Sequence, residues 1–365
     1  KEGPGIAVAV DLTGNEDAGA AALWSRALRR TLAEEPEHEV FLPTPAAGSG
    51  RLRQALADYL RQSRGMEVDP DRIVVGAGAQ VLDNILVQLL GRDAAFAVED
   101  PGYPRLKRLY EANGVRRVGQ VPLDGEGVRT DALSASDADV LHIMPSHQFP
   151  TGRVTSISRR YELLGWASAG SSEHRRWIIE DDFDCEFRLA GKPIPPLAAI
   201  DAPGCVIYTN TFSKSLSSAL RLAYMVLPDR LMEQYRQELG FYASTVSSID
   251  QIVLAHLLET GGYERHVRRV RKRARDARDA LAAAIAEAGL EDRVHLEGAD
   301  AGLHAVLAIK TERDEHELLR VLGTPAGCAS ALGDHLWCAE HGASDGLRRL
   351  VVQYLALEKE SEGEL

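Results

Sequence analysis

The pattern of apolar positions predicts alternating strands and helices over the middle of the chain, from about residue 73 to residue 227. Short apolar runs rich in β-branched residues are typical of strands, whereas apolar residues three and four positions apart are typical of helices. We expect strands at residues 73–75, 94–98, 115–121, 140–144, 177–180 and 205–210, and helices at residues 81–90 and 157–169. This alternation predicts an α/β fold with a mainly parallel, doubly wound sheet.

The rest of the chain follows a different pattern. Helices are expected at residues 21–33, 52–61, 231–238, 249–258 and 264–288, and strands near residues 294–296, 303–309 and 350–354. The late strands predict a second, smaller α+β lobe. The helix at 264–288 carries eight lysines and arginines between Arg265 and Arg278, with acids such as Asp276 among them. We interpret this run as a solvated helix face, the alternative being a patch for an acidic partner.

Glycines and polar residues follow several of the predicted strands. Residues 76–80 (GAGAQ) lead into a helix, an arrangement in which backbone N–H groups bind phosphate, although a tight turn that binds nothing has the same pattern. Residues 99–106 (EDPGYPRL) present Tyr103 and Arg105 at a strand end, and residues 145–152 (PSHQFPTG) follow another strand. In such sheets ligands collect outside the carboxyl ends of the strands, so we expect these loops to converge on one site.

One lysine, Lys214, follows the strand at 205–210 and stands among hydroxyl groups and an arginine. Thr211 and Ser213 precede it, and Arg221 comes seven residues later. An amine in this setting suits a covalently held phosphorylated aldehyde, because the lysine forms the Schiff base while the hydroxyls and the guanidinium hold the phosphate. The alternative is a surface lysine in a loop.

Three carboxylates, Asp181, Asp182 and Asp184, crowd the end of the strand at 177–180. Carboxylates at a strand end can bind a metal ion, but no histidine lies within three residues of them and the other loops suit a phosphate and an amine. We therefore predict no metal. Strand alternation places Asp181 and Phe183 on one face and Asp182 on the other.

Composition excludes several classes of protein. The chain has 365 residues and a formal net charge of −12, which argues against nucleic-acid binding by this chain alone. No apolar run approaches the roughly 18 residues that span a bilayer, and we expect no membrane partner. The four cysteines are scattered and form no CxxC motif, as in reduced cytoplasmic proteins.

Taken together, GAGAQ, EDPGYP, PSHQFPTG, EDDFDCEFR and TFSK followed by Arg221 resemble, in order and spacing, the fold-type-I pyridoxal-phosphate aminotransferases. More narrowly, the chain resembles the aminotransferase-like effector domain of the MocR/GabR-type transcriptional regulators of the GntR superfamily. The resemblance implies a large cofactor-binding domain at 45–255, a small domain built from 1–44 and 256–365, and a homodimer. It also implies that DNA is bound only through an N-terminal winged-helix domain, which is not present in this chain.

The resemblance also implies roles for individual residues. Lys214 and Asp181 would be catalytic, the lysine as the Schiff-base amine and the carboxylate as the partner of the pyridine nitrogen. Tyr103 would stack on the cofactor ring, and His147 and Phe183 would lie near its phenolate oxygen. Arg105 and Arg348 would bind the ligand carboxylate. The phosphate would be held by Gly78, Ala79, Gln80, Thr211, Ser213 and Arg221.

Two positions depart from the family pattern. Phe149 stands where aminotransferases carry an asparagine that bonds the phenolate oxygen, and Phe183 stands where the regulators carry a tyrosine. His147 or Gln148 could substitute. The sequence therefore favours an effector-sensing domain that forms aldimines with a small amino compound and transaminates weakly. The alternative is a free-standing aminotransferase, and a lyase or racemase on the same fold is a third.

Overall fold

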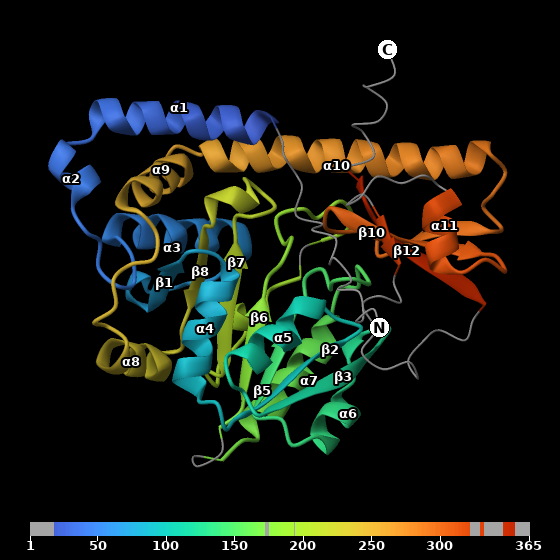
Figure 1. Ribbon diagram of the computed structural model, residues 1–365, viewed down its shortest axis with the longest axis horizontal. Helices are drawn as coiled ribbons and strands as arrows, with labels where there is room; N and C mark the ends of the chain where they lie inside the picture. Colours follow the sequence, from blue (N-terminus) through green and yellow to red (C-terminus); the bar gives the residue numbers. More distant parts are fainter. Residues whose placement is uncertain (1–17, 172–174, 193, 322–328, 332–345, 355–365) are drawn as a thin grey trace, which may run out of the picture.

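The computed structural model describes residues 18–171, 175–192, 194–321, 329–331 and 346–354, which form a large and a small β-sheet flanked by helices (Figure 1). The large sheet has eight strands in the order β1-β8-β7-β6-β5-β2-β3-β4. Its strands are β1 (Ile73–Gly76), β2 (Ala95–Asp100), β3 (Arg117–Asp124), β4 (Gly127–Val128), β5 (Val140–Ile143), β6 (Trp177–Asp181), β7 (Val206–Thr211) and β8 (Ala223–Val226). The predicted α/β fold class is confirmed.

Five neighbouring strands of the large sheet, β7, β6, β5, β2 and β3, are parallel, as predicted. Two strands run the other way: β8 lies antiparallel to both β7 and β1, and the two-residue edge strand β4 lies antiparallel to β3. A parallel crossover needs about a dozen residues or more and usually a helix. Residues 212–222 carry only the short 3₁₀ helix η3 (Ser218–Leu220), so the chain turns back instead.

Helices cover both faces of the large sheet. On one face lie α4 (Ala79–Leu90), α5 (Pro104–Ala112) and α8 (Asp229–Glu238), which pack on alternate strand residues such as Val74, Ile179 and Ile207. The other face is covered by α3 (Gly50–Arg64) and α9 (Ser248–Glu259) near β1 and β8, and by α6 (Thr130–Ala135) and α7 (Ile157–Ser168) near β5 and β6. Because both faces are buried there, strands such as β1 and β8 are continuous apolar runs, whereas the outer strand β3 is half-buried or exposed along most of its length.

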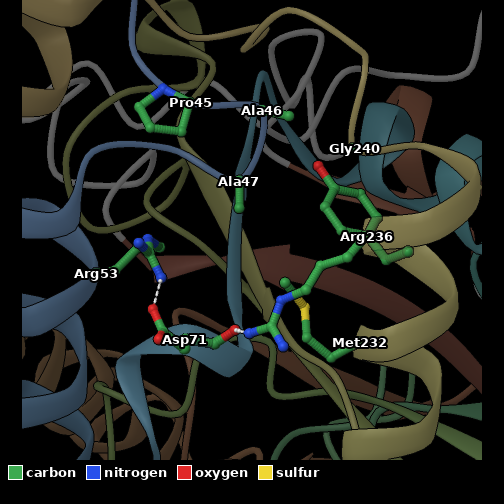
Figure 2. Close-up of a pocket in the computed structure, with 9 residues that line it drawn as sticks. Pro45, Ala46, Ala47, Arg53, Asp71, Met232, Arg236 and Gly240 are labelled. Carbon is green, nitrogen blue, oxygen red and sulfur yellow. Dashed lines mark hydrogen bonds and ion pairs between the residues drawn. The ribbon is translucent and has the colours of Figure 1, made fainter.

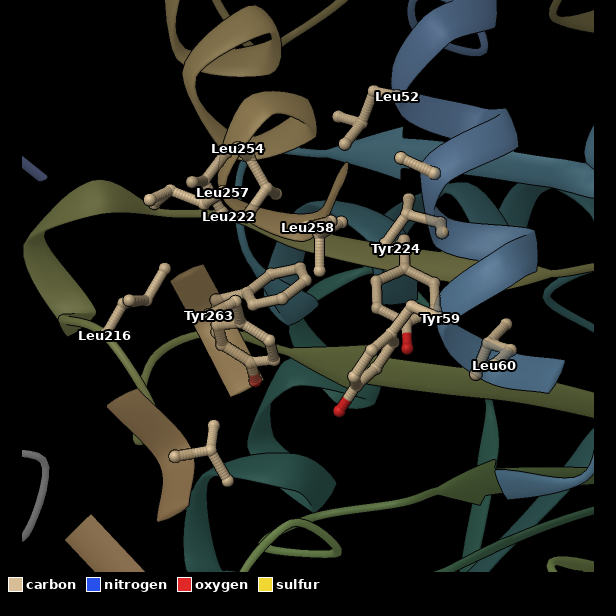
Figure 3. Close-up of a cluster of buried hydrophobic side chains, with 14 of the residues drawn as sticks. Leu52, Tyr59, Leu60, Leu216, Leu222, Tyr224, Leu254, Leu257, Leu258 and Tyr263 are labelled. Atoms are coloured by element: carbon tan, nitrogen blue, oxygen red, sulfur yellow. The ribbon is translucent and has the colours of Figure 1, made fainter. Parts of the chain in front are cut away.

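The core on the α3–α9 face is rich in leucine and tyrosine (Figure 3). Tyr59 of α3, Tyr224 of β8 and Tyr263 of α10 (Gly262–Glu287) are all buried there. The rings of Tyr59 and Tyr263 meet edge to face with their centroids 5.4 Å apart. This cluster connects the large sheet to α10, the longest helix among the described residues.

The small sheet is wholly antiparallel, in the order β11-β12-β10-β9. Its strands are β9 (Val294–Glu297), β10 (His304–Lys310), β11 (Ala329–Ala331) and β12 (Leu347–Gln353). Helix α11 (Glu315–Val321) covers one face through Leu318, which packs on Leu350 and Val352. The predicted domain limits, 45–255 for the large domain and 1–44 with 256–365 for the small one, remain a prediction.

Helices α1 (Ala18–Glu34) and α10 run along the same edge of the molecule (Figure 1), and the short α2 (Glu37–Phe41) leads from α1 toward the large sheet. Two further 3₁₀ helices are η1 (Pro70–Arg72) and η2 (Leu197–Ala199). None of the helices within the described residues is long and apolar enough to cross a membrane.

The basic run on α10 corrects one prediction. Three of its arginines do not simply face solvent, because they donate to backbone carbonyl groups of other segments. Arg271 Nε lies 2.9 Å from the Glu186 carbonyl oxygen, and Arg275 Nε lies 3.2 Å from that of Leu189. Arg278 reaches the Ala299 carbonyl. The solvated-face interpretation is therefore wrong for the half-buried Arg271 and Arg278. Arg275 is exposed, and Lys272 and Asp276 form the expected exposed pair along the helix.

Candidate functional site

The candidate site lies at the carboxyl ends of the parallel strands, where several loops bring aromatic rings toward Lys214. The Lys214 Nζ atom is 6.0 Å from the centroid of the Phe183 ring, which follows β6. Phe149, in the loop after β5, meets Phe183 at 6.3 Å and Tyr103 at 5.9 Å, both edge to face. Three of the predicted loops and the lysine therefore converge, as ligand sites in this sheet type require.

Hydrogen bonds at the base of its loop hold Lys214 in place. The Phe212 N–H donates to the Leu222 carbonyl at 2.9 Å and closes the loop between β7 and β8. The Thr211 hydroxyl accepts from the Ser213 N–H at 3.2 Å, so both hydroxyl residues belong to the same turn. Lys214 is half-buried at the strand end.

The first turn of α4 and Arg221 together form a cradle for an anion. A side chain at Gly78, which has a φ of 90°, would lie 2.3 Å from Arg221 Nη2, so only glycine allows this close approach. Gly78 is the N-cap of α4, which leaves the N–H groups of Ala79 and Gln80 without helical acceptors at the positive end of the helix dipole. Arg221 forms no ion pair with any carboxylate in the described ranges.

Asp181 is the last residue of β6 and lacks a hydrogen-bond donor within the described chain. Burial, together with the charges of Asp83, Asp182 and Glu99, raises the pKa of Asp181 well above its usual range. A carboxyl in this setting is stabilised as an anion only when a cationic donor reaches it. Asp181 therefore suits a protonated heterocyclic nitrogen.

Asp182 points to the opposite face of the strand, as alternation predicts. Its carboxylate pairs with Arg64 of α3, at 2.7 Å from Nε to Oδ2, and accepts hydrogen bonds from Ser146 and Tyr208. Burial alone would raise the pKa of Asp182, but Arg64 and these donors hold it below its usual range. Because its carboxylate already binds Arg64, Ser146 and Tyr208, Asp182 is not available to a ligand.

The buried carboxyl of Asp83, on α4, leads to a testable pH dependence. Burial raises its pKa to about 7, so the folded state binds a proton that the unfolded state, with a pKa near 3.9, releases. Stability contributed by this site therefore falls as pH rises from 4 to 7. We expect Asp83→Asn to raise the free energy of unfolding by on the order of 2 kcal/mol at pH 8 and by much less at pH 4.

Urea unfolding at both pH values measures this difference. Asp93→Asn is the matched control, since its side chain is 81% exposed and pairs with Arg116 at the surface. An equal gain for Asp83→Asn at both pH values would contradict the assignment.

The loop after β5 does not offer Gln148 to a ligand. Its Nε2 donates to the Pro101 carbonyl at 2.9 Å, and its Oε1 accepts from the Thr151 hydroxyl at 2.6 Å. His147 is fully buried, and its Nε2 lies 3.0 Å from Nδ1 of His304. His147 and Gln148 are the two side chains that could replace the missing donors to the phenolate oxygen. Both are therefore already hydrogen-bonded to other protein groups.

Sequence reasoning missed His304, the first residue of β10. Its ring is 5.2 Å from the centroid of Phe149 and 6.3 Å from that of Phe183. A single histidine in a strand of the small sheet carries no sequence signal, because its partners lie more than a hundred residues away.

The structure does not bring Arg348 to the site. β12 begins at Leu347, so Arg348 lies within the strand, and its Nε donates to the Arg313 carbonyl at 3.1 Å on the outer side. The β12 residue that packs against Phe149 is Val351. Arg349, on the same face as Val351, pairs with Glu297 at 2.9 Å. Among the predicted carboxylate-binding residues, Arg105 remains, exposed in the first turn of α5 close to Tyr103.

A separate cavity of about 430 Å³ lies among the loop at Pro45–Ala47, α3 and α8 (Figure 2). Its charged groups are already paired, since Arg53 contacts the Asp71 carboxylate at 2.7 Å and Arg236 donates to the Asp71 carbonyl at 2.8 Å. None of the candidate site residues lines it, and we assign it no function.

The fold and the site define a protein of the fold-type-I aminotransferase class. The chain belongs to the family described as aminotransferase class I and II, whose model matches residues 10–329. Membership implies pyridoxal phosphate as the cofactor. The fold is also that of the Pyrococcus horikoshii kynurenine aminotransferase solved in complex with PMP, with a TM-score of 0.74, 21% identity and coverage of 94% of this chain and 85% of that one.

The sequence is more similar to transcriptional regulators. It is 36% identical over 296 residues to the "uncharacterized HTH-type transcriptional regulator YdeL" of Bacillus subtilis. It is 34% identical over 295 residues to the pyridoxine biosynthesis regulator PdxR of Corynebacterium glutamicum. Each match covers 81% of this chain and 62% of the regulator, so the chain spans less than two thirds of either relative.

Proposed function

We propose that this chain is the pyridoxal-phosphate-binding, effector-sensing domain of a bacterial transcription regulator. The observation that carries the proposal is the combination, at one sheet edge, of Lys214, the unpartnered carboxyl of Asp181 and the anion cradle of Gly78 and Arg221. An aldehyde, a pyridine nitrogen and a phosphate are the three groups that these features suit. A single molecule of pyridoxal phosphate carries all three.

In this proposal each residue has a distinct task. Lys214 holds the cofactor covalently and Asp181 accepts the N–H of its ring, which supplies an electron sink when bound. Tyr103 covers the ring, and Arg105 binds the acidic end of a small amino compound. The phosphate is held by Gly78, Ala79, Gln80, Thr211, Ser213 and Arg221. We further propose a cytoplasmic homodimer that contacts DNA through a separate domain.

Sensing is favoured over efficient turnover by the groups that surround the predicted phenolate position. Phe149 and Phe183 offer no hydrogen bond, while His147 and Gln148 are already bonded to other protein groups. A sensor needs only a bound state that differs from the free state, whereas an efficient aminotransferase needs these donors. The free-standing aminotransferase stays the second candidate.

A screen of amino compounds with 2-oxo acid acceptors separates the two functions. We expect the amino compound to change the absorption spectrum of the cofactor without forming a product. In Lys214→Ala we expect no spectral change. A turnover number on the order of 1 s⁻¹ or more would favour the enzyme instead. Restoring a hydroxyl with Phe183→Tyr is expected to increase any slow turnover.

Two arginines allow the cofactor and ligand roles to be separated. Arg221→Ala is expected to weaken pyridoxal-phosphate binding by about 2–3 kcal/mol, because it removes a charge-assisted contact to the phosphate. Arg105→Ala should leave cofactor affinity nearly unchanged and weaken the response to the amino compound. Equilibrium titrations of both variants measure this, and the reverse order of cofactor affinities would contradict the assignment.

A further inference from the structure

We propose that His147, Asp184 and His304 form a binding site for a divalent transition metal such as Zn²⁺. The sequence pattern predicted no metal, because the two histidines are far from Asp184 along the chain. The fold brings the three side chains together. The proposal does not rest on the proposed function, since it concerns a different chemical group and a different test.

The geometry of the three side chains suits one ion. Each offers one ligand atom, and these atoms all lie within 4.8 Å of one another. Zinc binds imidazole nitrogens and carboxylate oxygens at about 2 Å, so donors around one ion lie roughly 3–4 Å apart. All three side chains are more than nine-tenths buried. Two histidines and one carboxylate leave a fourth position open.

Nδ1 of His147 and Oδ1 of Asp184 make no hydrogen bond to the described residues, whereas the other carboxylate oxygen of Asp184 accepts from the Leu303 N–H at 3.0 Å. The Gly152 carbonyl lies near the His147 ring, but no hydrogen bond of ordinary geometry reaches Nδ1. Buried polar atoms without partners are rare, and each indicates a missing group.

The local backbone is built to bring the cluster together. Gly302, with a φ of 73°, lies so close that a Cβ there would be 2.0 Å from the His147 ring. Asp184 has a left-handed φ of 56°, which is unfavourable for an L-residue.

A metal here would join the two sheets. His147 and Asp184 come from loops after β5 and β6 of the large sheet, and His304 begins β10 of the small sheet. Binding that is confined to the folded state stabilises it in proportion to ligand concentration. The melting temperature should therefore rise with metal concentration.

The test uses the purified chain, stripped with a chelator and titrated with Zn²⁺ and with Co²⁺ as a spectroscopic probe. We expect one ion per chain and the visible absorption of four-coordinate Co²⁺ with nitrogen and oxygen ligands. Asp184→Asn and His304→Ala should each lower the affinity at least about tenfold, the smallest loss seen when even an outer partner of a metal site is removed.

His295→Ala is the matched control, because His295 is an exposed histidine on β9 and should not change the affinity. Absence of bound metal in the parent chain would overturn the proposal, and so would affinities unchanged by both ligand substitutions. If His304→Ala does not fold, the parent titration and Asp184→Asn still decide between these outcomes.

Discussion

Lys214→Ala is expected to abolish covalent attachment of pyridoxal phosphate, the largest functional effect of any single substitution in this chain. Only an amine forms the reducible bond with the aldehyde, and Lys214 is the lysine that faces Phe183 at the edge of the sheet. The parent protein should show the absorbance of the bound cofactor and, after borohydride reduction, a modified peptide that contains Lys214. The variant should show neither, while keeping weak, non-covalent affinity through Arg221 and the first turn of α4.

Lys272→Ala is the control for this experiment, because that lysine is exposed on α10 and paired with Asp276. It should leave attachment unchanged. Recovery of the reduced adduct on Lys107, Lys192 or Lys272 instead of Lys214 would show that the candidate site is not the cofactor site.

Local sequence patterns predicted most of the large sheet, because its strands are short apolar runs and its helices have clear periodicity. The structure adds the antiparallel strand β8, which the sequence analysis did not separate from the segment after Arg221. Its direction depends on the length of the loop at 212–222 and on pairing with β1, about 150 residues earlier in the chain. Pairing over such a separation leaves no local pattern.

The candidate site, like the fold, could be predicted only where local sequence patterns mark its residues. Lys214, Tyr103 and Phe183 follow strand ends, so their convergence could be predicted from the sheet topology. The placement of Arg348 could not, since a shift of the strand start decides which of two adjacent arginines faces the large sheet. His304 and the arginines of α10 were missed or misread for a related reason. Their partners are backbone carbonyls or side chains from other segments, which composition and spacing do not reveal.

Arg64→Met is expected to cause the largest loss of stability among the substitutions considered. Arg64 and Asp182 form an ion pair whose side chains are 7% and 0% exposed. Removing the guanidinium leaves a buried carboxylate without a cationic partner, and the remaining donors, such as the Ser146 and Tyr208 hydroxyls, are neutral. Breaking a buried pair in this way costs about 3–5 kcal/mol. Arg61→Met on the same helix is the control, because Arg61 pairs with Asp58 at the surface and should contribute less than about 1 kcal/mol.

The loss should depend on pH in a defined direction. In the parent protein the pKa of Asp182 lies below its usual range, so its contribution is present above pH 4 and is lost only as pH falls through the lowered value. Without Arg64 the burial effect dominates and the pKa of Asp182 rises, so the variant takes up a proton at a higher pH than the parent does. The difference in free energy of unfolding between the two proteins should therefore shrink as the pH is lowered from 7. Urea unfolding at several pH values measures it, and a difference that is constant from pH 7 to pH 5 would mean that Arg64 stabilises the fold by packing instead of by its charge.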